Sequence, residues 1–412
     1  MIANVDPARS GRIAEAGMSE MLERASERID QEFAGQPQLQ AELRTTLGDT
    51  WTGIGLYDRG LNEYQIAFDL REELFGADSK EALLSMGRLG VALVSIGRQE
   101  EAIEMFTQQI EGMAPIVDRQ DPSLLMAKLH LSDVYIYLAR FSEAEALLTE
   151  VIDITGRDGA GPSNVSVEAK AAMGAMTGAR GDVAASEQWF IDALADLDRI
   201  DVVDHVRRQS LQWEVAIAVA RQGRSEEATV MLRELLEDRE STLGVDHPLT
   251  LSTAGTLGAV LANSGDLAAA EPYLQRVYDG QLRTLGAEHP NTLITLGNLG
   301  NMQMEQGKVE LGRASAQIGL AAAMRTLTPG DPTIRIFQRL MARVLIKQEQ
   351  YDEAQELAQL AVDGAVSAYG EQSSETRLAL DMLLQVLVAR GDTDGADAVR
   401  ARVERIREAA GN

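Results

Sequence analysis

The chain has 412 residues, of which 45% are hydrophobic and 4% aromatic, so it can bury a core made mainly of aliphatic side chains. Its net charge of −26 disfavours nucleic acid and anionic membranes as partners, because both repel an acidic surface. The absence of cysteine excludes disulfides, zinc–thiolate sites and thiol nucleophiles.

The N-terminal stretch MIANVDPARSG lacks the basic and apolar regions of a signal peptide. No apolar run approaches the roughly 18 residues that a membrane-spanning helix needs. We therefore expect a soluble protein that makes no membrane contact itself and is cytoplasmic by default. The first predicted element is an amphipathic helix over residues 13–34, which can cap the array that follows.

From residue 41 to the C-terminus the sequence repeats with a period of 42 residues and no insertion or deletion. Two columns of this frame hold Gly, Ala or Ser at seventeen of eighteen positions. The first column is Gly48, Gly90, Ser132, Gly174, Ala216, Gly258, Gly300, Ala342 and Leu384. The second is Gly60, Ala102, Ala144, Ser186, Ala228, Ala270, Gly312, Ala354 and Ala396.

A third column, seven residues after the first, holds Gly at seven of nine positions, with Ala139 and Glu349 as the exceptions. Glycine there can adopt the left-handed conformation that ends a helix. Between the columns, apolar residues recur at helical spacing. Each unit therefore predicts helix A, a tight turn and helix B, and the fold class is an all-α solenoid of about nine such units.

The stretch LGVDHPLTL (243–251) returns as LGAEHPNTL (285–293), 42 residues later. Proline is favoured at the first position of a helix, so Pro248 and Pro290 predict the starts of successive helices A. His247 and His289 then stand at helix boundaries, where we expect a structural role rather than catalysis or metal binding. A Gly-rich stretch, TGRDGAGPSN (155–164), predicts a longer loop and a soft boundary near residues 155–165 within a repeat domain that spans residues 41–412.

The columns resemble the tetratricopeptide repeat, as in TTLGDTWTGIGLYDRGLNEYQIA (45–67) and RLGVALVSIGRQEEAIEMFTQQI (88–110). The 42-residue period and the LGxxHPxT linker resemble the kinesin-light-chain-like subclass. This resemblance implies a right-handed superhelix whose helices A line a concave, non-catalytic binding face. Residues 1–40 resemble the stretch before the repeats in bacterial Ser/Thr protein kinases of the eukaryotic-like type. No kinase motif is present, and whether Met1 is a native start stays open. As part of a membrane-anchored kinase, the chain would be extracytoplasmic.

The resemblance also implies which helix-A positions face the concave groove. The polar and aromatic residues at those positions are Arg88, His130, Asp133, Tyr137, Trp213, Glu214, Arg221, Asn298, Asn301, Arg339, Arg343 and Lys347. The last three form a basic stripe at four-residue spacing, which suits a carboxylate or an extended peptide. The alternative is that these cations pair with acids of neighbouring units, such as Asp381.

We predict a non-catalytic interaction scaffold that binds a peptide or protein segment in its concave groove, without cofactor or metal. If the kinase resemblance holds, the groove is the partner-sensing part of a signalling protein. The alternative function is a structural self-assembly module. The partner, the pathway and the oligomeric state stay open.

Overall fold

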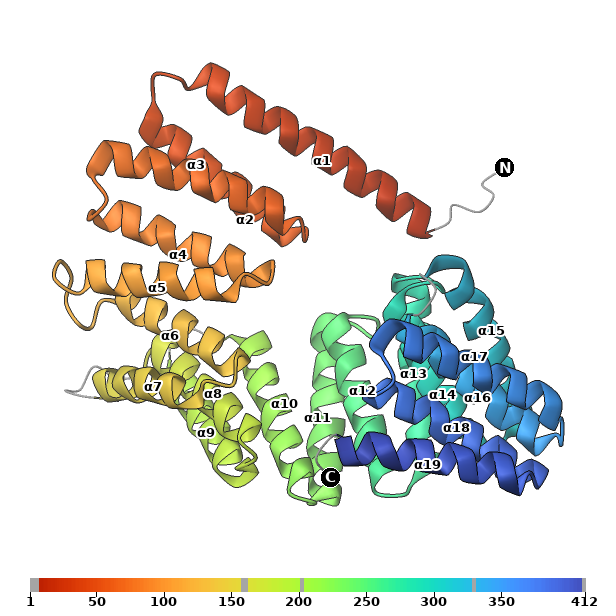
Figure 1. Ribbon diagram of the computed structural model, residues 1–412. Coiled ribbons are helices and arrows are strands. Elements are labelled where there is room, and N and C mark those ends of the chain that lie inside the picture. Colours follow the sequence, from red (N-terminus) through yellow and green to blue (C-terminus); the bar gives the residue numbers. More distant parts are fainter. Residues whose placement is uncertain (1–6, 157–161, 201–203, 328–330, 410–412) are drawn as a thin grey trace. The chain divides into compact units, whose positions relative to one another are not determined.

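The protein was analysed as a computed structural model that describes residues 7–156, 162–200, 204–327 and 331–409 (Figure 1). Across these ranges every regular element is a helix and no strand occurs, so the predicted all-α fold is confirmed. Helix α1 (Pro7–Glu32) comes first, and nine helix pairs follow it through the described ranges.

In each pair, helix A is joined by a tight turn to an antiparallel helix B. The helices A are α2 (Pro37–Gly53), α4 (Lys80–Ser95), α6 (Pro122–Tyr137), α8 (Asn164–Ala179), α10 (His205–Arg221), α12 (Pro248–Asn263), α14 (Pro290–Glu305), α16 (Pro332–Lys347) and α18 (Ser374–Arg390). The helices B are α3 (Tyr57–Phe75), α5 (Gln99–Met113), α7 (Phe141–Gly156), α9 (Val183–Leu197), α11 (Ser225–Leu243), α13 (Leu267–Thr284), α15 (Val309–Thr326), α17 (Tyr351–Tyr369) and α19 (Thr393–Ala409). The first helix A begins at Pro37, whereas the array was expected from residue 41.

Side chains cap the start of each helix A after α2. The Asp121 carboxylate accepts a hydrogen bond from the backbone N–H of Ser123 at 2.9 Å, directly before α6. At the equivalent positions, Nδ1 of His247 and Nδ1 of His289 each accept a backbone N–H two residues later, at 3.2 Å. Each of these three caps is followed by a proline as the first helical residue. The predicted boundary role of both histidines is confirmed.

The third column marks the turn between helices A and B. All nine of its residues have positive φ, which are Gly55, Gly97, Ala139, Gly181, Gly223, Gly265, Gly307, Glu349 and Gly391. Ala139 at 56° and Glu349 at 60° are the two non-glycine residues with positive φ in the described chain. The turn geometry is kept where glycine is missing, so the pairing of the two helices determines the positive φ. Glycine only lowers the energy of that backbone conformation.

Helix α1 packs on the first pair through its second half. Ile29 is buried together with Leu47 and Trp51. The guanidinium of Arg44, only 2% exposed, forms ion pairs at 2.6 Å with both Asp30 of α1 and Glu63 of α3. A buried arginine that satisfies two carboxylates at once fixes the position of α1 against the first pair.

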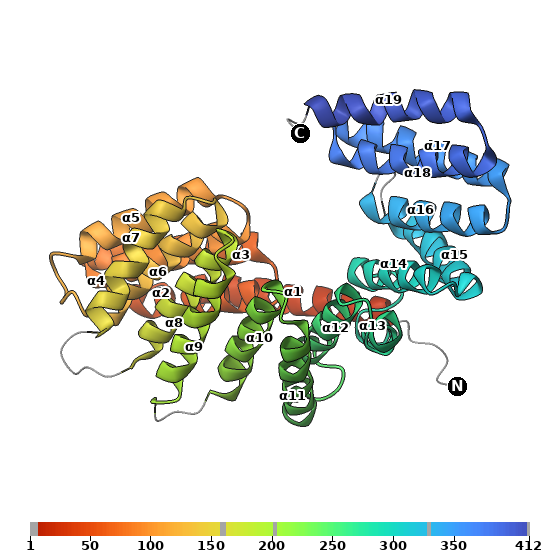
Figure 2. The same cartoon turned by 90° about the horizontal axis from the view of Figure 1, so that it is seen from below.

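The chain divides into two compact units within α11, Arg9–Ala228 and Thr229–Asn412, which we call the N-terminal unit and the C-terminal unit. In each, consecutive helices pack side by side, as Figures 1 and 2 show for α2 to α9. The predicted soft boundary near residues 155–165 stays a prediction, because residues 157–161 of that loop lie outside the described ranges.

Candidate functional site

The inner side of each stack is formed by the helices A. Direct contacts join α4 to α6 and α6 to α8 in the N-terminal unit, and α14 to α16 and α16 to α18 in the C-terminal unit. The helices B of the described pairs show no comparably extensive contacts with one another. Helices that lie closer together form the concave side of a stack, so the concave surfaces are helix-A surfaces.

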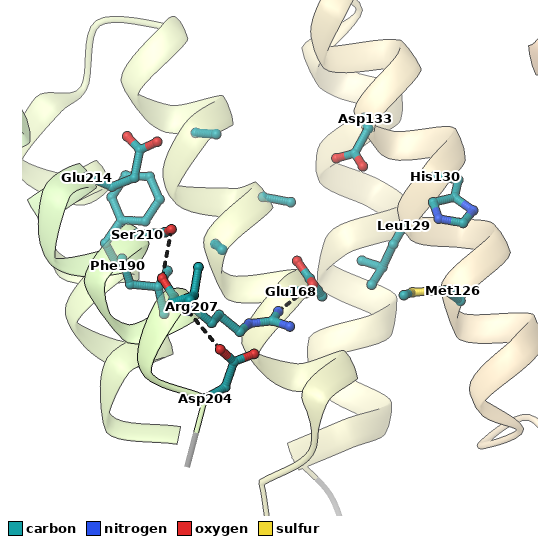
Figure 3. Close-up of a pocket in the computed structure, with 15 residues that line it drawn as sticks. Met126, Leu129, His130, Asp133, Glu168, Phe190, Asp204, Arg207, Ser210 and Glu214 are labelled. Carbon is teal, nitrogen blue, oxygen red and sulfur yellow. Dashed lines mark hydrogen bonds and ion pairs between the residues drawn. The ribbon is translucent and has the colours of Figure 1, made fainter. Parts of the chain in front are cut away.

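In the N-terminal unit, a pocket of about 700 Å³ lies between α6, α8 and α10, and we call it the acidic pocket (Figure 3). In Figure 3, His130 and Asp133 extend from α6, Glu168 from α8, and Arg207 and Glu214 from α10. The Arg207 guanidinium crosses to Glu168 and forms an ion pair at 2.5 Å. The walls between these groups are made of Met126, Leu129, Ala171, Ala172, Ala175, Phe190 and Leu211.

The carboxyl groups of the acidic pocket are perturbed by their surroundings. Asp133 is exposed to solvent at the mouth of the pocket. Partial desolvation by the surrounding protein, together with the negative charge of Glu168, raises the pKa of its carboxyl group to about 6. Burial also raises the pKa of Glu214 and lowers the pKa of His130. Near neutral pH the pocket therefore holds several carboxylates and one guanidinium, and it suits a cationic group.

A second pocket of the N-terminal unit, about 440 Å³, lies between α2, α4 and α6, with Gln109 of α5 behind them. It brings together the predicted residues Arg88 and His130. Arg88 forms an ion pair with Asp49 at 2.5 Å, and the same Asp49 oxygen accepts the hydroxyl hydrogen of Tyr64 at 2.7 Å. Arg88 is therefore held at the rim by a neighbouring repeat.

In the C-terminal unit, Arg339 and Arg343 of α16 line a groove of about 470 Å³ between α14, α16 and α18, which we call the Arg339 groove. Asn301 of the neighbouring helix α14 also lines this groove, and its side-chain oxygen accepts a hydrogen bond from Arg343 at 2.7 Å. Glu305 and Asp381 also line this groove. Asp381 pairs instead with Arg377 at 3.0 Å, within α18.

Neither Arg339 nor Arg343 forms an ion pair with any residue in the described ranges. Many other arginines of the same unit do form one, including Arg276, Arg283, Arg325, Arg377, Arg390 and Arg402. Burial in the groove lowers the pKa of Arg339. The nearby Glu375 carboxylate raises this pKa, but by less than burial lowers it. The predicted pairing of the stripe with Asp381 is thus not observed for the described residues.

The remaining predicted residues lie apart from these three concavities. Tyr137 is 73% exposed, and Asn298 and Lys347 are exposed on the surface. Trp213 is half-buried, and Arg221 donates a hydrogen bond to the carbonyl oxygen of Gly178 at 3.0 Å. Their role in binding stays a prediction.

Sequence reasoning missed Glu168, Arg207 and Gln109. Glu168 stands at an inward position of helix A, so a search of every such position for acids would have found it. Arg207 lies in the first turn of α10, before the inward positions begin, and Gln109 belongs to a helix B. No three His, Asp or Glu side chains of the described ranges group as metal ligands would. Likewise, no helix in those ranges has the length and apolar character needed to span a membrane.

Comparison with known proteins supports the repeat assignment. A sequence model of the tetratricopeptide repeat matches residues 207–283 and 252–311. The protein therefore contains tetratricopeptide repeats in this segment, and the same helix pairs recur on one frame through the rest of the described chain. The predicted resemblance to the tetratricopeptide repeat is confirmed. No curated protein matches its sequence.

Solved structures with TM-scores above 0.5 share the fold. One is a signal transduction ATPase from Pyrococcus horikoshii with a tetratricopeptide repeat sensor: it is 14% identical, with a TM-score of 0.61, over 79% of this chain and 47% of that chain. The apo form of RapI is 11% identical, with a TM-score of 0.57, over 79% of this chain and 97% of that chain. A putative kinesin light chain with tetratricopeptide-like repeats from Podosopora anserina is 23% identical, with a TM-score of 0.45, over 51% of this chain and 99% of that chain.

Proposed function

We propose that the protein is a non-catalytic scaffold that binds a peptide or protein segment along its helix-A surfaces. The observation that carries this proposal is the Arg339 groove, where two partly buried guanidinium groups lack a carboxylate partner among the described residues. A desolvated cation without a counter-charge lowers the stability of the fold. A carboxylate of a bound segment would offset that loss, and Asn301 adds a polar group beside it.

The acidic pocket supports the same proposal with the opposite charge. Its carboxylates suit a Lys or Arg side chain, and its apolar walls can hold the aliphatic stem of that side chain. We therefore expect the affinity of such a partner to depend on salt, since both surfaces recognise charge.

The proposal can be tested with a displayed library of random twelve-residue peptides selected on the full chain. For the peptides that bind, the double variant Arg339→Gln and Arg343→Gln should lower affinity at least tenfold, because two charge-assisted contacts are removed. The matched control is Arg283→Gln with Arg325→Gln, two exposed arginines on helices B of the same unit. Equal affinity of both double variants would remove the Arg339 groove from the binding surface.

The alternative function, self-assembly, rests on the opposite charges of the acidic pocket and the Arg339 groove. Light scattering separates the two functions. A monomer over a wide concentration range that still binds selected peptides supports the scaffold. An oligomer that dissociates in the Arg339→Gln and Arg343→Gln variant supports self-assembly.

The finer hypothesis that the scaffold senses a partner within a kinase signalling protein rests on the resemblance of residues 1–40. It predicts that a kinase domain is encoded upstream of Met1 in the same reading frame. A stop codon directly before Met1 would exclude that arrangement.

A further inference from the structure

Gln109 breaks a pattern that the other repeats keep. On the 42-residue frame its counterparts in the helices B are Ala67, Val151, Ala193, Leu235, Val277, Gly319, Ala361 and Val403. All of these are small or apolar and buried. The repeats act as internal controls, and they show that packing at this position needs no polar group.

The Gln109 side chain is 4% exposed, and its Oε1 has no hydrogen-bond partner in the described part of the chain. Leaving a buried amide oxygen unpaired is unfavourable, because its hydration is lost without replacement. A structural reason for glutamine is therefore missing, while a reason in binding is available.

Gly87 opens a path from the concave surface to this amide. A Cβ on residue 87 would lie 2.7 Å from both terminal atoms of the Gln109 side chain. The Gln109 amide thus packs against α4 at Gly87, where any larger residue would displace it, and both residues line the 440 Å³ pocket. In the equivalent pair of the sixth repeat, a Cβ on Gly255 would lie 3.7 Å from Val277, so the glycine there faces an apolar side chain.

We propose that this pocket is a subsite for the side-chain carboxamide of an Asn or Gln residue in the bound segment. A primary amide offers an N–H and a C=O on one edge, and Gln109 can match both. The rim supports this chemistry, since Arg88 and Asp49 are already paired with each other and favour a neutral guest. Leu84, Val91 and Met126 provide apolar contact for its methylene groups.

A side chain fits this path better than a peptide backbone does. Gln109 comes from the outer helix α5, behind the helix-A surface, and is reached through the gap at Gly87. A main chain lying across α2, α4 and α6 would stay on their outer surface. The inference rests on the proposed peptide-binding function and adds a specificity to it.

The test uses twelve-residue peptides selected from a displayed library on the full-length protein. Gln109→Val places the residue of the equivalent position Val277 in the pocket. We expect it to bind the selected peptides about tenfold more weakly, with a thermal midpoint equal to or above that of the unaltered protein. Gln108→Val, the same change at an exposed neighbour, is the matched control and should leave affinity unchanged.

The peptide is then altered in turn. Replacing its Asn or Gln by Leu should weaken binding to the unaltered protein and have no further effect on Gln109→Val, as a double-mutant cycle requires. If the effect of Gln109→Val is coupled instead to N-methylation of the peptide backbone, a main-chain amide occupies the pocket. That result would overturn the assignment.

Three further outcomes separate the inference from the proposed function. Selected peptides that bind Gln109→Val as tightly as the unaltered protein would refute the subsite and leave the scaffold standing. A lowered thermal midpoint in Gln109→Val would show a structural role for the amide and also refute the subsite. Failure to select any peptide would refute both.

Discussion

Gly90 of α4 lies against the ring of Phe106 of α5, so that a Cβ on residue 90 would approach Cε1 of the ring to 2.7 Å. A Cβ on Gly48 would likewise lie 2.5 Å from the ring of Tyr64, and a Cβ on Gly174 would lie 3.0 Å from the ring of Phe190. Where the first column holds Ser132 or Ala216, the facing residue of helix B is a leucine, Leu148 or Leu232. Small and large side chains are thus matched across these five pairs.

Gly90→Ala should destabilise the protein by about 1–3 kcal/mol, because the buried ring of Phe106 must shift. Adding Phe106→Leu should recover part of that loss, since it recreates the combination found at Ala216. Urea denaturation measures both. Gly255→Ala is the matched control, because its Cβ would meet only Val277 at 3.7 Å. It should stabilise by about 0.5–1 kcal/mol through helix propensity, and equal effects at the two glycines would refute the packing argument.

Ala139→Gly and Glu349→Gly should each raise the free energy of unfolding, by up to about 1 kcal/mol. Both residues hold a left-handed conformation, at φ of 56° and 60°, that costs less for glycine. The reverse change, Gly97→Ala at φ 79°, should destabilise by a similar amount. Thermal denaturation compares the stability of the three variants with that of the unaltered protein. A loss of stability in Ala139→Gly would contradict the argument that the left-handed conformation costs less for glycine.

His247→Ala should lower the free energy of unfolding by about 1 kcal/mol, because the N–H of Leu249 loses its capping acceptor. His247→Asp should restore it, since Asp121 and Asp331 fill the same position in other repeats. Chemical denaturation distinguishes the two variants. A stable His247→Ala with altered peptide binding would contradict the capping role.

Asp133→Asn should change how stability depends on pH. The folded protein holds this pKa at about 6 against an ordinary value of 3.8, so between these values only the unfolded chain releases the proton. The free energy of unfolding of the unaltered protein therefore falls as pH rises through this range. Asp133→Asn has no such proton to release. The free energy of unfolding of the variant minus that of the unaltered protein should therefore increase from pH 4 to pH 7. Urea titrations at several pH values measure it, and a difference that is constant with pH would refute the perturbed pKa.

The repeat frame was readable from the sequence because close helix packing needs small residues at fixed intervals, and because turns and caps use few residue types. Those signals correctly placed Pro248, His247 and Gly97. The binding surfaces were harder to predict. The ion pair of Arg207 with Glu168 joins two repeats, and the sequence frame does not show which neighbours a long side chain reaches. Gln109 lies on a helix B, outside the positions that the resemblance assigns to binding.

The division into two compact units falls inside one helix, between Ala228 and Thr229 of α11. The extensive contacts between described helices join immediate or next-but-one neighbours in the chain. Each pair can therefore form once its neighbours are present, and assembly can begin at several places and spread in both directions. Proteolytic loss of the last pair would then shorten the array and leave the earlier pairs folded.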